Sequence, residues 1–175
     1  MAETQTFATG RMDAEKENIM QLVGFTIGAE QFGVDILMVQ EIIRAAPITV
    51  VPNSPDFVEG VINLRGNIIP VIELRKRLNL YTGEVDKSDT WILILDIAGR
   101  ITGFIVDSVT EVLKILESSI EPPPEIIVAG LESQYIRGVC EIADKLLILL
   151  DFNRILLVEE IKKLKEVGPD REGGN

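Results

Sequence analysis

Residues 57–80 read FVEGVINLRGNIIPVIELRKRLNL, and this stretch decides the fold. The apolar residues between Val61 and Ile72 predict a strand and its antiparallel return, with Arg65-Gly66-Asn67 as the turn between them. The residues from Leu74 to Leu80 change to a helical spacing. Because proline cannot donate a backbone hydrogen bond, Pro70 indicates an edge or a bulge in the returning strand. The stretch therefore predicts a tight hairpin with an arginine at its tip.

Similar apolar runs, separated by short polar or glycine-containing turns, lie on both sides of this hairpin. The expected strand pairs are residues 22–27 with 31–36, 91–96 with 101–106, and 135–139 with 145–152. From Asn153 the sequence ILLVEEIKKLKEV has apolar residues at helical spacing, with Asn153 as the expected N-cap. Polar segments at residues 1–18 and 168–175 are expected to be disordered tails.

The chain also repeats itself. Gly33 aligns with Gly103, and FVEGVINL at residues 57–64 aligns with YIRGVCEI at residues 135–142. Each half has the same order of a hairpin, an extended segment, a proline-containing loop, two further strands and a short helix. A half of about 70 residues suits a small closed barrel, which leaves few exposed strand edges.

The repeat therefore predicts a mainly β protein of two five-stranded SH3-like barrels, packed together with short helices and a groove between them. We expect a folded region at residues 19–167, made of a first subdomain at about 19–84, a second at about 85–152 and a C-terminal helix at about 153–167. Residues 81–88 are polar and are the best candidate for the boundary between the halves.

The net charge of −11 and the sequence pI near 4.5 argue against nucleic acid or an anionic membrane as the partner, since both attract basic surfaces. No stretch reaches the ~20 apolar residues of a membrane span. The first residues lack the apolar centre of a signal peptide, so a cytoplasmic protein is expected. The single cysteine, Cys140, cannot form an internal disulfide and is expected to be a small buried residue.

The sequence contains no histidine, which removes the usual general base and the commonest metal ligand. It also lacks the glycine-rich loops that bind phosphate groups. We therefore expect no enzyme activity, no cofactor and no metal. The competing hypothesis is an enzyme that uses a pair of carboxylates between the barrels.

Arg65 is a functional candidate because the two halves differ at this position. The corresponding turn of the second half carries Ala143, so a barrel does not need an arginine there. The planar guanidinium suits a carboxylate or the carbonyls at a helix end. Gly60, in contrast, has a counterpart in Gly138, which favours a backbone requirement in both barrels.

Three motifs resemble the CheW family of bacterial chemotaxis coupling proteins. They are Val34-Asp35-Ile36 with Val39-Gln40-Glu41-Ile42, the run at residues 55–66, and the run PVIELR at residues 70–75. The resemblance covers about residues 21–157. It implies the CheW-like fold and an adaptor that links the cytoplasmic tip of chemoreceptors to the regulatory domain of the histidine kinase CheA. Other CheW copies in ring assemblies are further partners that it implies.

The resemblance also implies two sets of site residues. The receptor-binding set falls on Val39, Glu41, Gly60, Asn63, Arg65, Val109 and Val112. The contact with the ring or the kinase is expected around Glu121, Glu125 and Ile126. The valines could equally be core residues, and Glu41 has a counterpart in Glu111 that favours a structural role. The alternative function is a CheW-like coupler of a motility or surface-sensing pathway.

Overall fold

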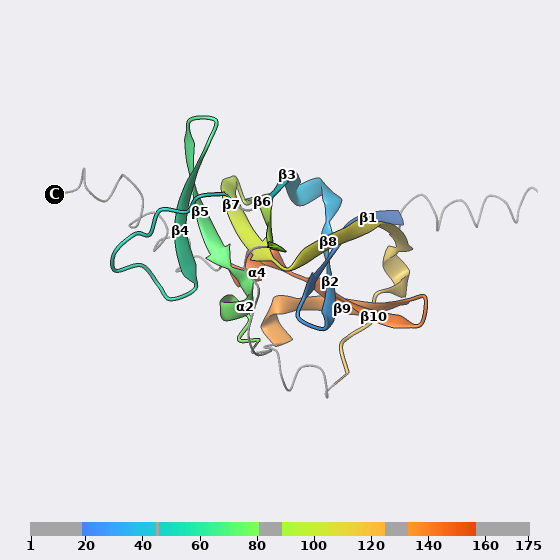
Figure 1. Ribbon diagram of the computed structural model, residues 1–175. Coiled ribbons are helices and arrows are strands. Elements are labelled where there is room, and N and C mark those ends of the chain that lie inside the picture. The colour runs from blue at the N-terminus through green and yellow to red at the C-terminus, as the bar shows by residue number, and fades with distance from the viewer. Residues whose placement is uncertain (1–18, 45, 81–88, 125–132, 157–175) are drawn as a thin grey trace, which may run out of the picture.

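The computed structural model describes residues 19–44, 46–80, 89–124 and 133–156 (Figure 1). These residues form ten strands in two five-stranded sheets, which is consistent with two SH3-like subdomains. Sheet A has the order β8-β1-β2-β10-β9, and sheet B has the order β3-β6-β7-β5-β4. The strands are β1 (Ile19–Ile27), β2 (Glu30–Asp35), β3 (Val39–Arg44), β4 (Val58–Leu64), β5 (Asn67–Glu73), β6 (Trp91–Ile97), β7 (Arg100–Val106), β8 (Ser108–Leu116), β9 (Ile136–Ile142) and β10 (Lys145–Leu150).

Short helices connect or follow several of these strands. They are η1 (Ile36–Met38), α2 (Leu74–Arg77), η3 (Glu117–Ser119), η4 (Ser133–Tyr135) and α4 (Phe152–Ile155). Asp151 is the N-cap of α4 and accepts hydrogen bonds from the backbone N–H groups of Asn153 and Arg154. The expectation that Asn153 is the cap is therefore wrong by two residues, because the aspartate carboxylate already satisfies these amides. The rest of the expected C-terminal helix, and both expected tails, lie outside the described residues.

The β4–β5 hairpin is confirmed. Arg65 and Gly66 both have positive φ, at 53° and 88°, as a two-residue hairpin turn of the I′ type requires. The side-chain oxygen of Asn63 accepts a 2.8 Å hydrogen bond from the Gly66 N–H and closes the turn. An arginine in this conformation is uncommon, because its Cβ crowds the backbone.

Pro70 is tolerated for a reason that the sequence does not reveal. β5 is an interior strand, since it pairs with β4 on one side and with β7 on the other. The pairing with β7 covers Val71 to Glu73, however, and leaves Pro70 beyond its end. On the other side, Val61 opposite Pro70 directs its backbone groups to Thr49, through two hydrogen bonds of 2.9 Å. The missing N–H of Pro70 therefore breaks no pairing in the ladder.

The two sheets do not follow the expected division near residue 84. Sheet A combines the first hairpin, β1–β2, with β8, β9 and β10, while sheet B combines the second hairpin, β6–β7, with β3, β4 and β5. Each half of the chain thus gives its hairpin to the sheet of the other half. In Figure 1, β4 and β5 lie at one side of the molecule, and β9 and β10 lie at the other side together with β1 and β2.

The exchange of hairpins follows from the length of one connection. If β2 stayed in the sheet of β3, it would take the place of β7, which runs parallel to β3 across β6. Parallel strands in one sheet need a crossover of about a dozen residues or more. Only the three residues of η1 separate β2 from β3, so the chain must pass into the other sheet.

The internal repeat is visible in the registers of the two sheets. Leu149 pairs with Gly33 in sheet A, and Val71 pairs with Gly103 in sheet B, both in parallel.

The hydrophobic core has three parts. A shared core between the sheets contains residues of both, including Phe25, Phe32, Phe104 and Phe152. Two smaller cores belong to sheet B alone and to sheet A alone. Cys140 is buried in the core of sheet A, and burial raises the pKa of its thiol.

Arg77 joins the two halves at the centre of the repeat. Its guanidinium carbon lies 4.8 Å from the ring centroids of both Phe57 and Tyr135, which are equivalent residues of the repeat. Its Nε donates a 3.0 Å hydrogen bond to the carbonyl oxygen of Ile155. Because Arg77 and Ile155 are themselves equivalent positions, the arginine lies where the two repeats meet.

Candidate partner-binding site

Arg65 and Glu41 form an ion pair at the tip of the β4–β5 hairpin. Nη1 of Arg65 donates to Oε1 of Glu41 at 2.7 Å, and Nη2 donates to Oε2 at 2.6 Å. Hydrogen bonding by Arg65, with its positive charge, lowers the pKa of Glu41, and the same hydrogen bonds raise the pKa of Arg65. The side chain of Arg65 is 69% exposed, so a partner can still reach the guanidinium. The pair connects β3 to the turn that follows β4, and β3 and β4 are the two edge strands of sheet B.

Gly60 is buried, and its surroundings belong to the chain itself. A Cβ at this position would overlap the carbonyl oxygen of Thr49 and would lie 2.8 Å from the side chain of Ile48. Gly138 has the equivalent surroundings, formed by Ile120 and Glu121. The backbone requirement therefore accounts for both glycines, and Gly60 offers no surface to a partner.

The three predicted valines (Val39, Val109 and Val112), called the valine patch below, lie on edge strands of the two sheets. Val39 comes from β3, an edge strand of sheet B, and Val109 from β8, an edge strand of sheet A. Both are half-buried against the shared core. Val112 lies opposite the buried Val23 and is itself 54% exposed. The patch is thus partly core and partly accessible, which fits a surface that takes an apolar face of a partner helix.

A β-bulge separates the valine patch from the ion pair. On β3, Val39 pairs with Leu95 but Glu41 pairs with Ile94, so one extra residue is accommodated at Gln40. Leu95 belongs to the shared core, whereas Ile94 belongs to the core of sheet B alone. Val39 and Glu41 therefore point to opposite faces of β3, although two residues on a regular strand would share a face. Val39 therefore lies on the face of β3 that packs on the shared core, whereas Glu41 and its partner Arg65 lie on the opposite face.

Of the other predicted contact residues, the structure describes Glu121. It is exposed and is held by two backbone hydrogen bonds of 2.8 Å with Val139 of β9. Glu125 and Ile126 lie outside the described residues, so this contact stays a prediction.

Sequence reasoning missed two features near these groups. Met38 and Ile42 extend the half-buried apolar strip beside the valine patch. Arg75 of α2 donates to both carboxylate oxygens of Asp107 at 2.7 and 2.6 Å, and its side chain is only 10% exposed. Asp107 also accepts a 2.7 Å hydrogen bond from Gly28 N–H, so this bridge joins α2 to the turn of the β1–β2 hairpin. The repeat offered a signal for this bridge, because the positions equivalent to Arg75 and Asp107 carry Asn153 and Leu37 instead.

The described residues contain no group of three or more histidine, cysteine or acidic side chains placed to hold a metal ion. Within the same ranges, no helix has the length and apolar character needed to cross a membrane.

A family model for the CheW-like domain matches residues 21–160. The chain belongs to the CheW-like domain family. Members with sequences similar to this chain include a protein named "Chemotaxis protein CheW" from Klebsiella aerogenes, 38% identical over 82% of this chain and 85% of that protein. A protein of the same name from Treponema pallidum is 33% identical over 86% of this chain and 90% of its own length.

A solved member of the CheW-like family shares the fold. The crystal structure described as scaffolding protein TtCheW from Thermoanaerobacter tengcongensis has a TM-score of 0.72 and 39% sequence identity. The match covers 81% of this chain and 90% of the other. The expected family and the expected mainly β fold are both confirmed.

Proposed function

We propose that this protein is a non-catalytic chemotaxis adaptor that couples the cytoplasmic tips of chemoreceptors to the histidine kinase CheA and helps to assemble signalling arrays. Membership of the CheW-like family supports the role, as do similar proteins named for chemotaxis and scaffolding. The observation that carries the proposal is the valine patch on two edge strands, with an exposed arginine on the other side of β3. The adaptor would reach the receptor array through its partners and remain on the cytoplasmic side.

The valine patch and the Arg65–Glu41 pair would make different contacts with the receptor. The apolar face of the helix would cover the valine patch, where Val112 is the most exposed of the three valines and gains most from burial. Arg65 would exchange one or both of its hydrogen bonds with Glu41 for a carboxylate or carbonyl of the receptor. Glu41 holds the guanidinium in place until then, which lowers the cost of ordering a long side chain.

The first experiment offers a receptor cytoplasmic fragment and CheA to the purified protein, each alone and then together, with co-sedimentation as the measurement. We expect each partner to bind alone and all three to sediment as one complex. Binding of neither partner by the folded protein would reject the coupling function.

Variants then test the site. Val112→Asp should weaken receptor binding at least about tenfold, whereas Val50→Asp, at a valine that is 75% exposed and outside the patch, should leave it unchanged.

Arg65→Glu should also weaken receptor binding while the protein stays folded. Arg65→Asn is its matched control for the fold, because asparagine accepts positive φ and keeps the turn. Loss of folding in both Arg65 variants would make the arginine structural.

A further inference from the structure

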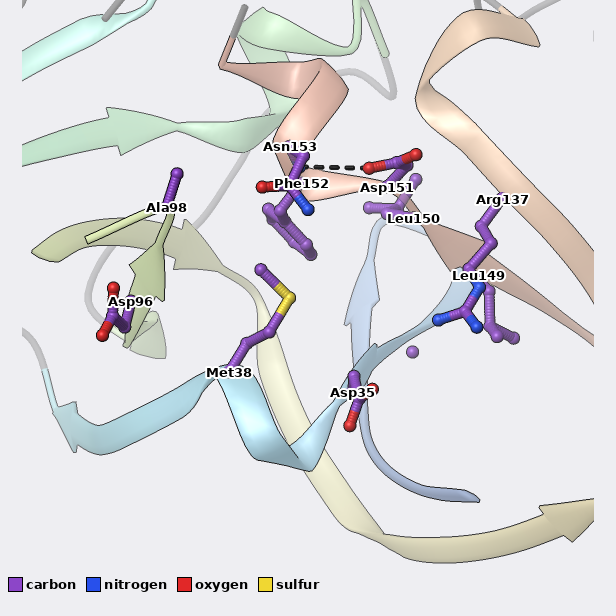
Figure 2. Close-up of a pocket in the computed structure, with 11 residues that line it drawn as sticks. Asp35, Met38, Asp96, Ala98, Arg137, Leu149, Leu150, Asp151, Phe152 and Asn153 are labelled. Carbon is purple, nitrogen blue, oxygen red and sulfur yellow. Dashed lines mark hydrogen bonds between the residues drawn. The ribbon is translucent and has the colours of Figure 1, made fainter. Parts of the chain in front are cut away.

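A cavity of about 470 Å³ opens between the two sheets, beside η1, and its lining includes neither a residue of the valine patch nor the Arg65–Glu41 ion pair. Figure 2 shows Met38 of η1 and Phe152 of α4 near its centre, with the carboxylates of Asp35, Asp96 and Asp151 around them. The volume falls within the usual range of small-ligand sites, about 300–1,000 Å³. The proposed function does not use this cavity.

Each of these three carboxylates uses one oxygen to accept hydrogen bonds from the backbone, which leaves the other oxygen for a ligand. Asp35 uses one oxygen to accept from Leu37 N–H at 3.0 Å, and Asp96 uses one to accept from Gly99 N–H, also at 3.0 Å. The second oxygen of each has no partner among the residues that the structure describes. Asp151 caps α4 with one oxygen, and its other oxygen lies 3.9 Å from Nε of Arg154.

One cation also lines the cavity, but it is engaged elsewhere. Arg137 of β9 donates a 3.1 Å hydrogen bond to Glu117 of η3. Its side chain is 38% exposed. The lining therefore carries three carboxylates against one guanidinium, and that guanidinium is held by a residue outside the lining.

The internal repeat shows what such a space can hold. The pair of Gly33 and Leu149 in sheet A is equivalent to the pair of Gly103 and Val71 in sheet B. Counting along the chain from these pairs gives the equivalent, in the other half, of residues in and next to the cavity. Asn153 corresponds to Arg75, Leu37 to Asp107, Asp96 to Thr26, and Met38 to Ser108.

In the other half, the equivalent space is filled by an arginine of the chain itself. The side chain of Arg75 is 10% exposed and makes its two-oxygen contact with Asp107 there. Thr26 and Ser108 close the same region with a 2.6 Å hydrogen bond between their hydroxyl groups. At the cavity, the shorter Asn153 replaces the arginine, and Leu37, which is 86% exposed, replaces the aspartate. The cavity therefore has room for a guanidinium, and its carboxylates lie at positions other than the equivalent of Asp107.

We propose that this cavity binds an arginine side chain presented by a partner protein. The methylene groups of the arginine pack on Met38, and the guanidinium lies toward the acidic lining, where Asp35 and Asp96 lie on opposite sides of Met38 (Figure 2). The guanidinium group of arginine suits a carboxylate acceptor, and its aliphatic stem favours an apolar floor. The net charge of −11 attracts a basic partner to the same surface.

The test uses N-acetyl-arginine methylamide as the probe and the corresponding citrulline compound, which has the same shape without the charge, as its control. Binding is followed by amide chemical shifts in a two-dimensional NMR titration of the full chain. We expect the arginine probe to shift amides of the cavity lining, such as those of Gly33 and Asn153, with at least tenfold higher affinity than citrulline. Equal binding of the two compounds, or shifts spread over the acidic surface, would overturn the proposal.

Two variants make the test specific. The double variant Asp35→Asn with Asp96→Asn removes both charges but keeps the oxygens that accept the Leu37 and Gly99 N–H groups. It should fold normally and bind the arginine probe at least tenfold more weakly. Asn153→Arg should fill the cavity from within, as Arg75 does in the other half, and should abolish binding of the probe. Unchanged binding in either folded variant would overturn the proposal, and the double variant decides alone if Asn153→Arg does not fold.

The same double variant separates a different partner from a second copy of this chain. Sedimentation equilibrium should show no dimer that depends on Asp35 and Asp96. A dimer that dissociates in the double variant would show that the arginine comes from another copy, and would overturn the assignment to a different protein.

Discussion

Gly60 and Gly138 each allow a neighbouring segment to come close enough for backbone pairing with the following valine. At Gly60 this neighbour is Thr49, and at Gly138 it is Glu121. Gly60→Ala should destabilise the protein by about 1–3 kcal/mol, because the methyl group must displace a backbone carbonyl. Gly99→Ala is the control, since Gly99 also has positive φ but has open space around it. Denaturant unfolding measures both, and equal losses would show that the conformation of Gly60, rather than the contact with Thr49, sets the effect.

The ion pair between Arg65 and Glu41 makes a pH-dependent contribution to stability. The pKa of Glu41 is below its ordinary value of 4.5 in the folded protein, because Arg65 hydrogen-bonds to and attracts the ionised form. A lowered folded pKa means that the contribution is present above the unfolded value and is lost as the pH falls through the folded value. NMR titration of the Glu41 carboxyl carbon should show a midpoint below 4.5, which returns toward 4.5 in Arg65→Asn. The same midpoint in both proteins would show that the pair does not persist in solution.

At the scale of the elements, Arg77 of α2 contacts the ring of Tyr135 in η4, the carbonyl oxygen of Ile155 in α4, and the ring of Phe57, which precedes β4. Arg77→Ala should lower the free energy of unfolding by about 1–2 kcal/mol, which is the range for a partly desolvated cation over an aromatic face. Arg77→Lys should recover only part of the loss, since an ammonium cannot stack between Phe57 and Tyr135. Thermal unfolding compares the three proteins. Full recovery by lysine would show that charge alone, without stacking, holds the elements together.

Several elements were predictable from the sequence because turn chemistry and alternation are local. The strands around Arg65-Gly66-Asn67 and Ala98-Gly99-Arg100 lie where their patterns indicate. The bulge at Gln40 was not predictable, since one extra residue on β3 leaves the apolar pattern intact. The resemblance to the CheW family implied a single receptor-binding set, whereas the structure places Val39 and Glu41 on opposite faces of β3.

At the scale of the whole molecule, the membership of the sheets could not be inferred from the repeat. The two hairpins β1–β2 and β6–β7 have the same register toward their parallel neighbours, so either hairpin would fit either sheet. Pattern alone therefore favoured two contiguous barrels. The deciding property was the length of the connection at residues 36–38, which is too short for a crossover within one sheet.

Cutting the chain at the expected boundary tests this exchange. Fragments 1–84 and 85–175 should each lack stable structure alone, because sheet A loses β8, β9 and β10 in the first fragment and sheet B loses β3, β4 and β5 in the second. Mixing the fragments should restore the β-sheet signal in circular dichroism and the dispersed amide spectrum of the intact chain. A stably folded monomeric fragment would show that a contiguous barrel is accessible and that the exchange is not obligatory.

The exchange also has a consequence for synthesis on the ribosome. β2 carries Phe32 and pairs with β10, more than a hundred residues later in the chain. At the usual translation rate of about 5–20 residues per second, the β1–β2 hairpin waits roughly 5–20 s for the strands that complete its sheet. During that interval Phe25 and Phe32, whose rings stack at 5.6 Å between centroids, have no shared core to cover them. The nascent chain therefore presents an aromatic surface to chaperones until the last strand of the protein has left the exit tunnel.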